Sequence, residues 1–372
     1  MKPHRQKLGM IAALGALALT LAACGSDDAT GDATTDPTTD TEEGSAADES
    51  VSGSLVGAGA SSQESAMQAW IAGFQAANPD ATVSYDPVGS GGGRTQFSEG
   101  GTAFGGTDAA MDEEEWGLAE ARCAPGAPAE LPLYISPIAV AFNLPGIDSL
   151  NMSPETVARI FNGDITSWDA PEIADANPEV ELPALAITPV NRSDESGTTE
   201  NFVEYLAAAA GDAWPHEVSG DWPVSGTQSA QGTSGVVQTT QSAEGAITYA
   251  DASKVGGLGT VAVQVGGEFV PYSPEAAAAV VDASPLAEGR AETSLVRELE
   301  RDTAESGVYP IVLVSYTMAC TQYEDEATGA LVKAFLTYVA SEEGQQAASD
   351  AAGSAPISDE MRANVMEIVD AI

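Results

Sequence analysis

The sequence predicts an α/β protein of two lobes, in which both ends of the folded part of the chain build the first lobe. After Val51, short strand-like segments alternate with helix-like segments, which favours an α/β architecture with a largely parallel sheet. Two long apolar runs, Leu133–Leu144 and Ile311–Met318, are rich in β-forming residues, and we interpret them as strands that cross between the lobes. The chain between them is long enough for a second domain.

Three strands and one helix are expected before the first apolar run. They are the strands Ser54–Val56, Thr82–Tyr85 and Thr102–Gly106 and the helix Glu64–Ala77. The helix is expected because Met67, Trp70 and Phe74 share one face, and because Asn78-Pro79-Asp80 ends the pattern. The glycine run Gly89–Gly93 is expected to form a loop.

After the second apolar run, residues Ala327–Ala340 are expected to form a helix, since Leu331, Phe335 and Val339 share one face. This helix would return the chain to the first lobe. The expected organisation is therefore a first lobe of residues 51–137 with 313–372 and a second lobe of residues 138–312.

Residues 1–23 have the pattern of an export leader. A basic start is followed by the uncharged run Leu8–Leu21, which is shorter than the roughly 20 residues that a spanning helix needs. The leader ends as Leu21-Ala22-Ala23-Cys24, which resembles a bacterial lipobox, where the cysteine is lipidated and becomes the first residue of the mature chain. The alternative is an ordinary signal peptide or a membrane anchor with an incidental cysteine.

Residues 24–50 are expected to form a disordered acidic tether behind the lipidated Cys24. They contain many Asp and Glu and no Lys or Arg, so they cannot bury enough apolar surface to fold, and their like charges extend them. Lipid, spacer and folded body together indicate an extracytoplasmic protein held on the outer face of the cell membrane.

The whole chain has 13 Lys and Arg against 56 Asp and Glu, a net charge of -43. Binding to nucleic acid is excluded, because it requires a basic surface that releases counterions from the phosphates. The acidity is explained by solubility outside the cell. Because disulfides persist in exported proteins, we expect Cys123 and Cys320 to pair, with two buried free thiols as the alternative.

Four polar loops at the ends of expected strands carry the candidate chemistry. They are Gly59–Ser62, Gly89–Gly92, Thr107–Asp108 and Asn191–Thr198. Helix N-termini, glycine backbone, hydroxyl groups and one arginine together supply the donors that a dehydrated tetrahedral oxyanion requires. Each loop has a plain alternative when taken alone: a flexible glycine loop, a capping box between Ser61 and Glu64, or a surface ion pair of Arg192 with Asp194.

Together, several motifs occur in order along the chain after Val51. They are Gly57–Ser61, Val88–Gly92, Phe104–Asp108, Asn143–Gly146, Ile160–Gly163 with Trp168, Arg192–Thr198, Gly245–Tyr249 and Tyr309–Ile311. In these motifs the chain resembles the phosphate-binding proteins of bacterial phosphate-specific ABC transporters, which are class II periplasmic-type solute-binding proteins. The resemblance implies two lobes that close by a hinge over the ligand, a permease as partner, and no cofactor. We expect a monomer.

The resemblance also implies roles for individual residues. Donors would come from Ser61, Ser90, Ser196, Gly197 and Thr198. Arg192, oriented by Asp194, would pair with the anion, and Asp108 would be the lone acceptor. Relatives often carry an aromatic residue where this chain has Ser62, so we expect Ser62 to donate a hydrogen bond instead. The Cys123–Cys320 pair would staple the chain close to both crossings.

Asp108 separates phosphate from sulfate in this interpretation. Near neutral pH phosphate carries a proton and can donate a hydrogen bond to a carboxylate, whereas sulfate carries none and is repelled. The remaining alternatives are binding of sulfate or molybdate, a phosphate sensor or scaffold, and an extracellular hydrolase. A hydrolase is disfavoured because His216 is the only histidine after the leader, and neither a Gly-x-Ser-x-Gly elbow nor a metal-binding cluster accompanies it.

Overall fold

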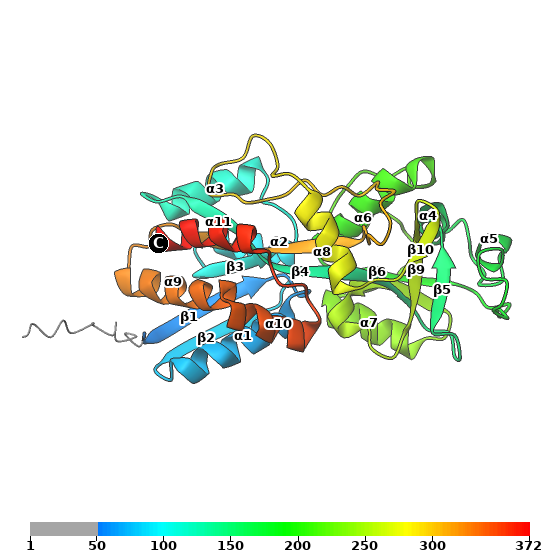
Figure 1. Ribbon diagram of the computed structural model, residues 1–372, viewed down its shortest axis with the longest axis horizontal. Coiled ribbons are helices and arrows are strands. Elements are labelled where there is room, and N and C mark those ends of the chain that lie inside the picture. Colours follow the sequence, from blue (N-terminus) through cyan, green and yellow to red (C-terminus); the bar gives the residue numbers. More distant parts are fainter. Residues whose placement is uncertain (1–50) are drawn as a thin grey trace, which may run out of the picture. The chain divides into compact units, whose positions relative to one another are not determined.

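The computed structural model describes residues 51–372, so the predicted leader, the lipidated Cys24 and the tether lie outside the described residues. The described part forms two α/β lobes that share one sheet, in the strand order β2-β1-β3-β11-β4-β8-β6-β7 (Figure 1). Among residues 51–372, no helix has the length and apolar character needed to cross a membrane.

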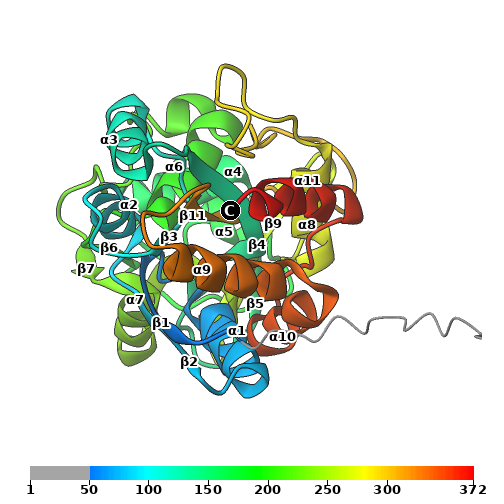
Figure 2. The ribbon, with the colours of Figure 1, turned by 90° about the vertical axis from the view of Figure 1, so that its left-hand side faces the viewer.

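The first lobe has a parallel three-stranded core in which β1 (Gly53–Gly59) lies between β2 (Ala81–Asp86) and β3 (Phe104–Thr107). Its helices are α1 (Glu64–Ala77), α2 (Ser90–Ser98), α3 (Glu113–Cys123), α9 (Glu326–Ala340), α10 (Glu342–Ala352) and α11 (Asp359–Asp370). The indole of Trp70 in α1 donates to the carbonyl of Gly344 at 2.7 Å, and Phe74 packs edge-on against Phe335. The C-terminal helices therefore complete the lobe that the first strands begin (Figure 2).

The second lobe contains six strands and five α-helices of the described chain. The strands are β5 (Ser149–Met152), β6 (Thr188–Arg192), β7 (Gln228–Ala230), β8 (Ala246–Asp251), β9 (Gly259–Val265) and β10 (Glu268–Val270). The helices are α4 (Pro154–Phe161), α5 (Pro171–Ala174), α6 (Gly197–Ala209), α7 (Gly232–Ser242) and α8 (Pro274–Ala283), with short 3₁₀ turns at Gly211–Ala213 and Ala252–Lys254. Large aromatic side chains, including Phe161, Phe202 and Tyr249, pack together behind β6.

Two buried strands connect the lobes, as the apolar runs predict. β4 (Pro128–Phe142) and β11 (Val312–Cys320) are buried at every residue and pair antiparallel from Pro137↔Val312 to Pro128↔Cys320. Beyond Ile138, β4 continues into the second lobe and pairs with β8 and β9. The expectation of a largely parallel sheet holds within the lobes except for the antiparallel β9–β10 pair. It is wrong for the connecting strands, since β4 and β11 make antiparallel pairs with each other and with their neighbours.

The glycine run at residues 89–93 is not a loop, which corrects the sequence prediction. Gly89 precedes α2, and Ser90 is already its first helical residue. The helix forms because Arg94 and Phe97 are buried one turn apart and hold it against the sheet. The glycines allow close packing: a Cβ on Gly93 would lie 2.5 Å from the Cα of Gly59.

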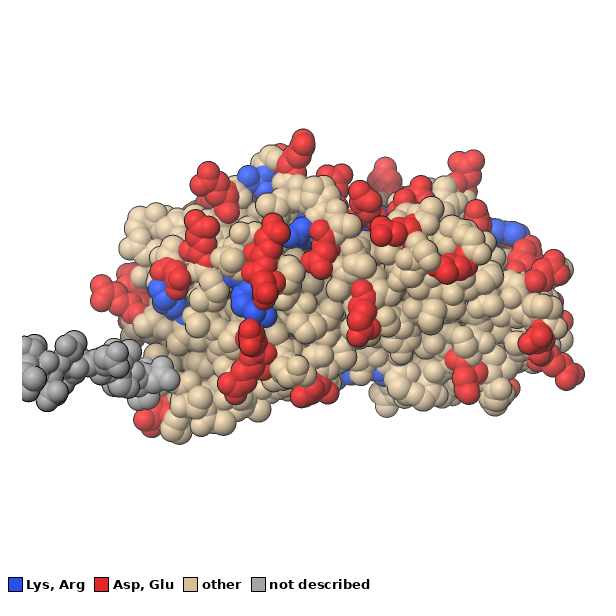
Figure 3. Space-filling view, viewed as in Figure 1, with Lys and Arg blue, Asp and Glu red and all other residues tan. Residues whose placement is uncertain are grey.

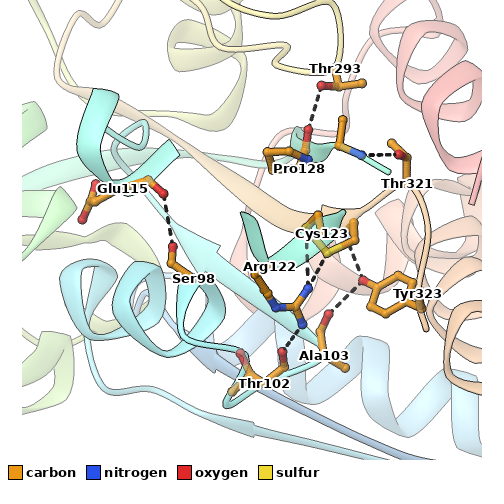
Figure 4. The surroundings of a disulfide bond; sticks show 12 residues. Ser98, Thr102, Ala103, Glu115, Arg122, Cys123, Pro128, Thr293, Thr321 and Tyr323 are labelled. Carbon is orange, nitrogen blue, oxygen red and sulfur yellow. Dashed lines mark hydrogen bonds between the residues drawn. A yellow bond between two sulfur atoms is a disulfide. The ribbon is translucent and has the colours of Figure 1, made fainter. Parts of the chain in front are cut away.

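The predicted disulfide between Cys123 and Cys320 is present, with a Cα–Cα distance of 5.2 Å. The disulfide lies beside Pro128↔Cys320, the last pair of the β4–β11 ladder. The strands cross between the lobes at the other end of this ladder, near Pro137. The expectation that the disulfide lies close to both crossings is therefore wrong, because it lies within the first lobe. Beside it, the guanidinium of Arg122 lies 4.5 Å from the ring centre of Phe97 and donates to the carbonyl of Thr102 (Figure 4).

Candidate anion-binding site

Asp108 lies where the two lobes meet and is 3% exposed. Its Oδ1 accepts from the hydroxyl of Ser62 in the same lobe at 2.7 Å, and its Oδ2 accepts from the hydroxyl of Thr198 in the other lobe at 3.0 Å. Its backbone N–H donates to the hydroxyl oxygen of Ser90 at 3.1 Å. The residues Ser62, Ser90, Asp108 and Thr198, predicted from separate loops, are thus brought into one hydrogen-bonded cluster.

Burial raises the pKa of Asp108, while the hydrogen bonds from Ser62 and Thr198 and the charge of Arg192 act in the opposite direction. The hydroxyl of Ser315 in β11 faces Asp108 and lowers this pKa as well. Because no other group of the described residues accepts from this buried hydroxyl, it is available to Asp108 or to a polar ligand beside it. No sequence motif singled out Ser315, because it lies inside an apolar strand.

Arg192 ends β6 and is 3% exposed, so the alternative of a surface ion pair is wrong. Its Nε donates to Asp194 Oδ1 at 2.8 Å, and its Nη2 contacts Asp194 Oδ2. The N–H of Gly232 at the start of α7 donates to the same carboxylate at 3.0 Å. Burial acts to raise the pKa of Asp194, but the hydrogen bonds and charge of Arg192 outweigh it and lower that pKa. Asp194 is therefore ionised and holds the guanidinium in place.

Ser61 does not cap α1, whose N-cap residue is Gln63 without a side-chain hydrogen bond. Instead, the hydroxyl oxygen of Ser61 accepts from the N–H of Thr233 in the second lobe at 3.0 Å and lies 3.1 Å from the Thr233 hydroxyl. The capping-box reading is wrong because the hydroxyl group is turned across the interface. Thr233 itself was not among the predicted site residues.

Helix N-termini from both lobes converge on this cluster. α2 begins at Gly89 without a side-chain cap, whereas the first N–H groups of α7, those of Gly232 and Thr233, donate to Asp194 and Ser61. α6 is capped by Ser196, whose hydroxyl oxygen accepts from the N–H of Thr199 at 3.2 Å. The N–H groups at such termini carry partial positive charge, which suits an anion. The side chain of Ser196 thus supports the helix that presents Gly197 and Thr198.

Glycine allows the lobes to approach closely at the site. A Cβ on Gly197 would lie 2.7 Å from the hydroxyl oxygen of Ser90 and 2.8 Å from the Cβ of Asp108. A Cβ on Gly89 would lie 2.5 Å from Asp194 Oδ2. Each of these contacts joins the first lobe to the second. The structure therefore has the lobes closed on each other around Asp108.

His216, the histidine considered for a hydrolase, does not make a hydrogen bond with the site serines. The ring of His216 packs against Trp214, and its Nε2 lies 2.8 Å from Asn162 Oδ1 rather than beside one of the site serines. Within residues 51–372 no group of three or more His, Cys, Asp or Glu is placed to hold a metal ion. What the cluster offers is a buried guanidinium held by Asp194, several hydroxyls, nearby helix N-termini and the carboxylate of Asp108. Such a set can bind a tetrahedral oxyanion that carries a proton.

Comparison with known proteins agrees with this chemistry. A family model described as a PBP superfamily domain matches residues 44–343. The chain is 33% identical over 368 residues to the phosphate-binding protein PstS 3 of Mycobacterium tuberculosis, covering 97% of each chain. It is 35% identical over 376 residues to PstS 3 of Mycobacterium leprae, covering 97% of this chain and 98% of the relative.

A solved structure shares the fold. A high-affinity periplasmic phosphate-binding protein with bound phosphate superposes with a TM-score of 0.68 at 20% identity, covering 84% of this chain and 93% of the other. At that identity the likeness shows the two-lobed fold. On the family match and the PstS relatives, this chain belongs to the PBP superfamily and, within it, to the family of PstS phosphate-binding proteins.

Proposed function

We propose that this protein captures inorganic phosphate between its two lobes and delivers it to an ABC-type importer. The observation that carries the proposal is the carboxylate of Asp108, set among donors and linked by hydrogen bonds to both lobes. The relatives at 33% and 35% identity are named phosphate-binding proteins, which supports the same ligand. The function is binding and release without chemistry on the ligand.

In the proposed complex, Arg192 neutralises the anion while Asp194 fixes its guanidinium. The donors come from the residues that the two lobes bring together: Ser61, Ser62, Ser90, Gly197, Thr198 and, newly, Thr233 and Ser315. Asp108 accepts a hydrogen bond from the hydroxyl group that phosphate retains near neutral pH. Sulfate has no such proton, so its negative charge would be repelled by the Asp108 carboxylate, and the site excludes it.

The lobes are proposed to be residues 51–137 with 313–372, and residues 138–312. The hinge then lies where β4 and β11 cross, near Pro137 and Val312, which pair with each other. Only two strands connect the lobes there, so a rotation about them can open and close the cleft.

The acidity of the protein does not conflict with an anionic ligand. Acidic side chains are scattered over the exposed face and basic ones are few (Figure 3), whereas Arg192 is buried. A buried charge and nearby helix N-termini act at short range, while exposed charges are screened over about 8 Å at physiological salt. The local field at the site therefore differs from that of the whole molecule.

We further propose that Cys24 carries a lipid that holds the protein on the outer face of the cell membrane, as a monomer. The leader and the tether of residues 24–50 support this arrangement through their sequence alone. A receptor anchored beside its permease releases the ligand close to the point of uptake.

Calorimetric titration of the mature chain, freed of endogenous ligand, with phosphate, sulfate and molybdate at neutral pH tests the ligand. We expect tight binding of phosphate only. Equal or tighter binding of sulfate or molybdate would assign the site to another oxyanion. Phosphate uptake in a deletion strain tests the transport role, because unchanged uptake would indicate a sensor or scaffold.

A further inference from the structure

Asp194 and Glu195 are neighbours in the chain, but their carboxylates hold arginines of different lobes. Asp194 pairs with Arg192 within the second lobe, whereas Glu195 pairs with Arg94 of α2 in the first lobe. One short segment therefore carries both a residue that positions the anion-binding guanidinium and a contact that bridges the lobes.

The guanidinium of Arg94 is held by protein groups, because each of its three nitrogens already has a partner. Its Nε lies 2.8 and 2.9 Å from the two carboxylate oxygens of Glu115, and its Nη1 donates to the hydroxyl of Thr107 at 3.1 Å. Its Nη2 meets Glu195. The residue is 5% exposed. The first lobe alone thus fixes the guanidinium, and only Glu195 is contributed from across the interface.

Gly91 provides the space that Glu195 occupies. A Cβ on Gly91 would lie 1.7 Å from Glu195 Oε2 and 2.3 Å from its Cδ. The residue has ordinary helical geometry in α2, so its backbone does not itself require glycine. The requirement comes from the opposite lobe, and it exists only while the lobes are closed.

We propose that Arg94, Glu195 and Gly91 form an interlobe latch that sets how long the protein retains its ligand. The inference rests on the proposed function in that the retained ligand is phosphate. Closing brings Glu195 onto the glycine and against a guanidinium that Glu115 and Thr107 already hold. Opening separates the Arg94–Glu195 ion pair and leaves Arg94 paired with Glu115 in its own lobe. The latch therefore acts on dissociation of the ligand, and hardly on its first encounter with the open cleft.

Two further ion pairs join residues of the two proposed lobes, with the acid in the first lobe and the base in the second: Glu130 with Arg290, and Glu64 with Lys254. Glu64 at the start of α1 lies 3.2 Å from Lys254 of the second lobe and 3.5 Å from the hydroxyl of Ser234. Both side chains of the Glu64–Lys254 pair are 25% exposed, whereas the latch pair joins the 6% exposed Arg94 to the 45% exposed Glu195. Each of these two pairs therefore includes a solvent-screened group, and what distinguishes Arg94 is that Glu115 and Thr107 already hold its guanidinium.

Stopped-flow kinetics of phosphate binding test the latch in Glu195→Gln. We expect the dissociation rate to rise about fivefold, the upper range for a partly exposed ion pair, with little change in the association rate. Glu204→Gln is the matched control. Glu204 is 43% exposed and pairs with the buried Arg301, as Glu195 is 45% exposed and pairs with the buried Arg94, but its pair lies within the second lobe. Equal dissociation rates in wild type, Glu195→Gln and Glu204→Gln would overturn the latch.

Gly91→Ala supplies a second test through a double-mutant cycle. Alone it should raise the dissociation rate, because the methyl group displaces the carboxylate from Arg94. Combined with Glu195→Ala it should add nothing beyond Glu195→Ala alone, since the methyl group then meets no carboxylate. An equal effect of Gly91→Ala in both backgrounds would contradict the proposal.

The latch can be tested separately from the ligand. If wild type fails to bind phosphate in calorimetry, the proposed function fails. Small-angle X-ray scattering without ligand then decides the latch by itself. A larger radius of gyration in Glu195→Gln than in wild type and in Glu204→Gln would support it, and equal radii would overturn it.

Discussion

The hydroxyl of Thr198 donates to Oδ2 of Asp108 at 3.0 Å, although the two residues belong to different lobes. The other carboxylate oxygen accepts from Ser62 of its own lobe. The carboxylate proposed to recognise the ligand proton is thus also a contact between the closed lobes. Lobe closure and ligand discrimination depend on the same side chain.

Asp108→Asn should reduce the preference for phosphate over sulfate by at least about tenfold, because an amide can donate to an unprotonated oxyanion and carries no charge to repel it. The amide oxygen still accepts one of the two hydroxyl donors. The measurement is the ratio of the two dissociation constants by calorimetry. An unchanged ratio would remove Asp108 from the selectivity argument.

Arg192→Ala should weaken phosphate binding by about 100-fold, in the range of a lost hydrogen-bonded charge in a buried site. Because the variant also leaves Asp194 without its partner, Arg192→Ala/Asp194→Ala is measured beside it and should bind equally poorly. Arg159→Ala is the control, since Arg159 forms an exposed ion pair with Glu172. Tight binding by either Arg192 variant would place the anion elsewhere.

The free energy of unfolding should fall as pH rises from about 4 to 7, because the buried Asp251 must lose its proton in the folded protein. Burial raises the pKa of this carboxyl from 3.8 to about 6, and the charge of Asp108 acts in the same direction. The folded state therefore binds the proton more tightly than the unfolded state, and its advantage is lost as the pH passes through the folded pKa. At about 1.4 kcal/mol for each pKa unit, the loss approaches about 3 kcal/mol.

Asp251→Asn tests this cause, since the amide oxygen can still accept from Tyr134 and from the N–H of Ser253. Urea unfolding at pH 4.5 and 7.5 should show the variant gaining stability relative to wild type at the higher pH. A stability difference that is the same at both pH values would show that Asp251 does not titrate in this range.

Replacing both Cys123 and Cys320 by alanine should lower the free energy of unfolding by about 2–5 kcal/mol. The bond closes a loop with a sequence separation of 197 residues, so it strongly restricts the unfolded chain. Phosphate affinity should stay at the wild-type value, because both cysteines lie in the first lobe, away from Asp108. Urea unfolding and calorimetry measure the two effects, and a large loss of affinity would tie the disulfide to the hinge.

Cys24→Ser should move the protein from the membrane fraction to the soluble fraction of fractionated cells, because the serine cannot take the lipid. Phosphate binding by the released protein should be unchanged. Retention in the membrane fraction would contradict the proposed lipid anchor.

The sequence patterns correctly predicted the helices and strands that are determined by residues close together in the chain. The helix Glu64–Ala77 has the predicted bounds, because an apolar face defines it and Pro79 follows its end. The two apolar runs form the strands that connect the lobes. They could be recognised because a strand that is buried on both faces consists almost entirely of apolar residues. The disulfide is confirmed as well, because export and an even number of remaining cysteines restrict the choices.

Features that depend on distant partners could not be read from the sequence. Ser61 has the spacing of a helix cap, but its partner Thr233 lies 172 residues further along the chain. The glycines at residues 91–93 have the sequence pattern of a loop. Only the structure shows the groups that pack against them and explain why glycine is present in a helix there. Glu195 likewise gives no sign that its arginine is Arg94, 101 residues earlier.

The disulfide also determines what happens when the backbone is cut. Every peptide bond of the second lobe lies between Cys123 and Cys320. A protease that nicks this lobe once, at any of its surface turns, yields two fragments that remain covalently joined through the sulfurs. Each fragment also keeps one strand of the antiparallel β4–β11 ladder. A receptor exposed to enzymes outside the cell can therefore be nicked without falling apart.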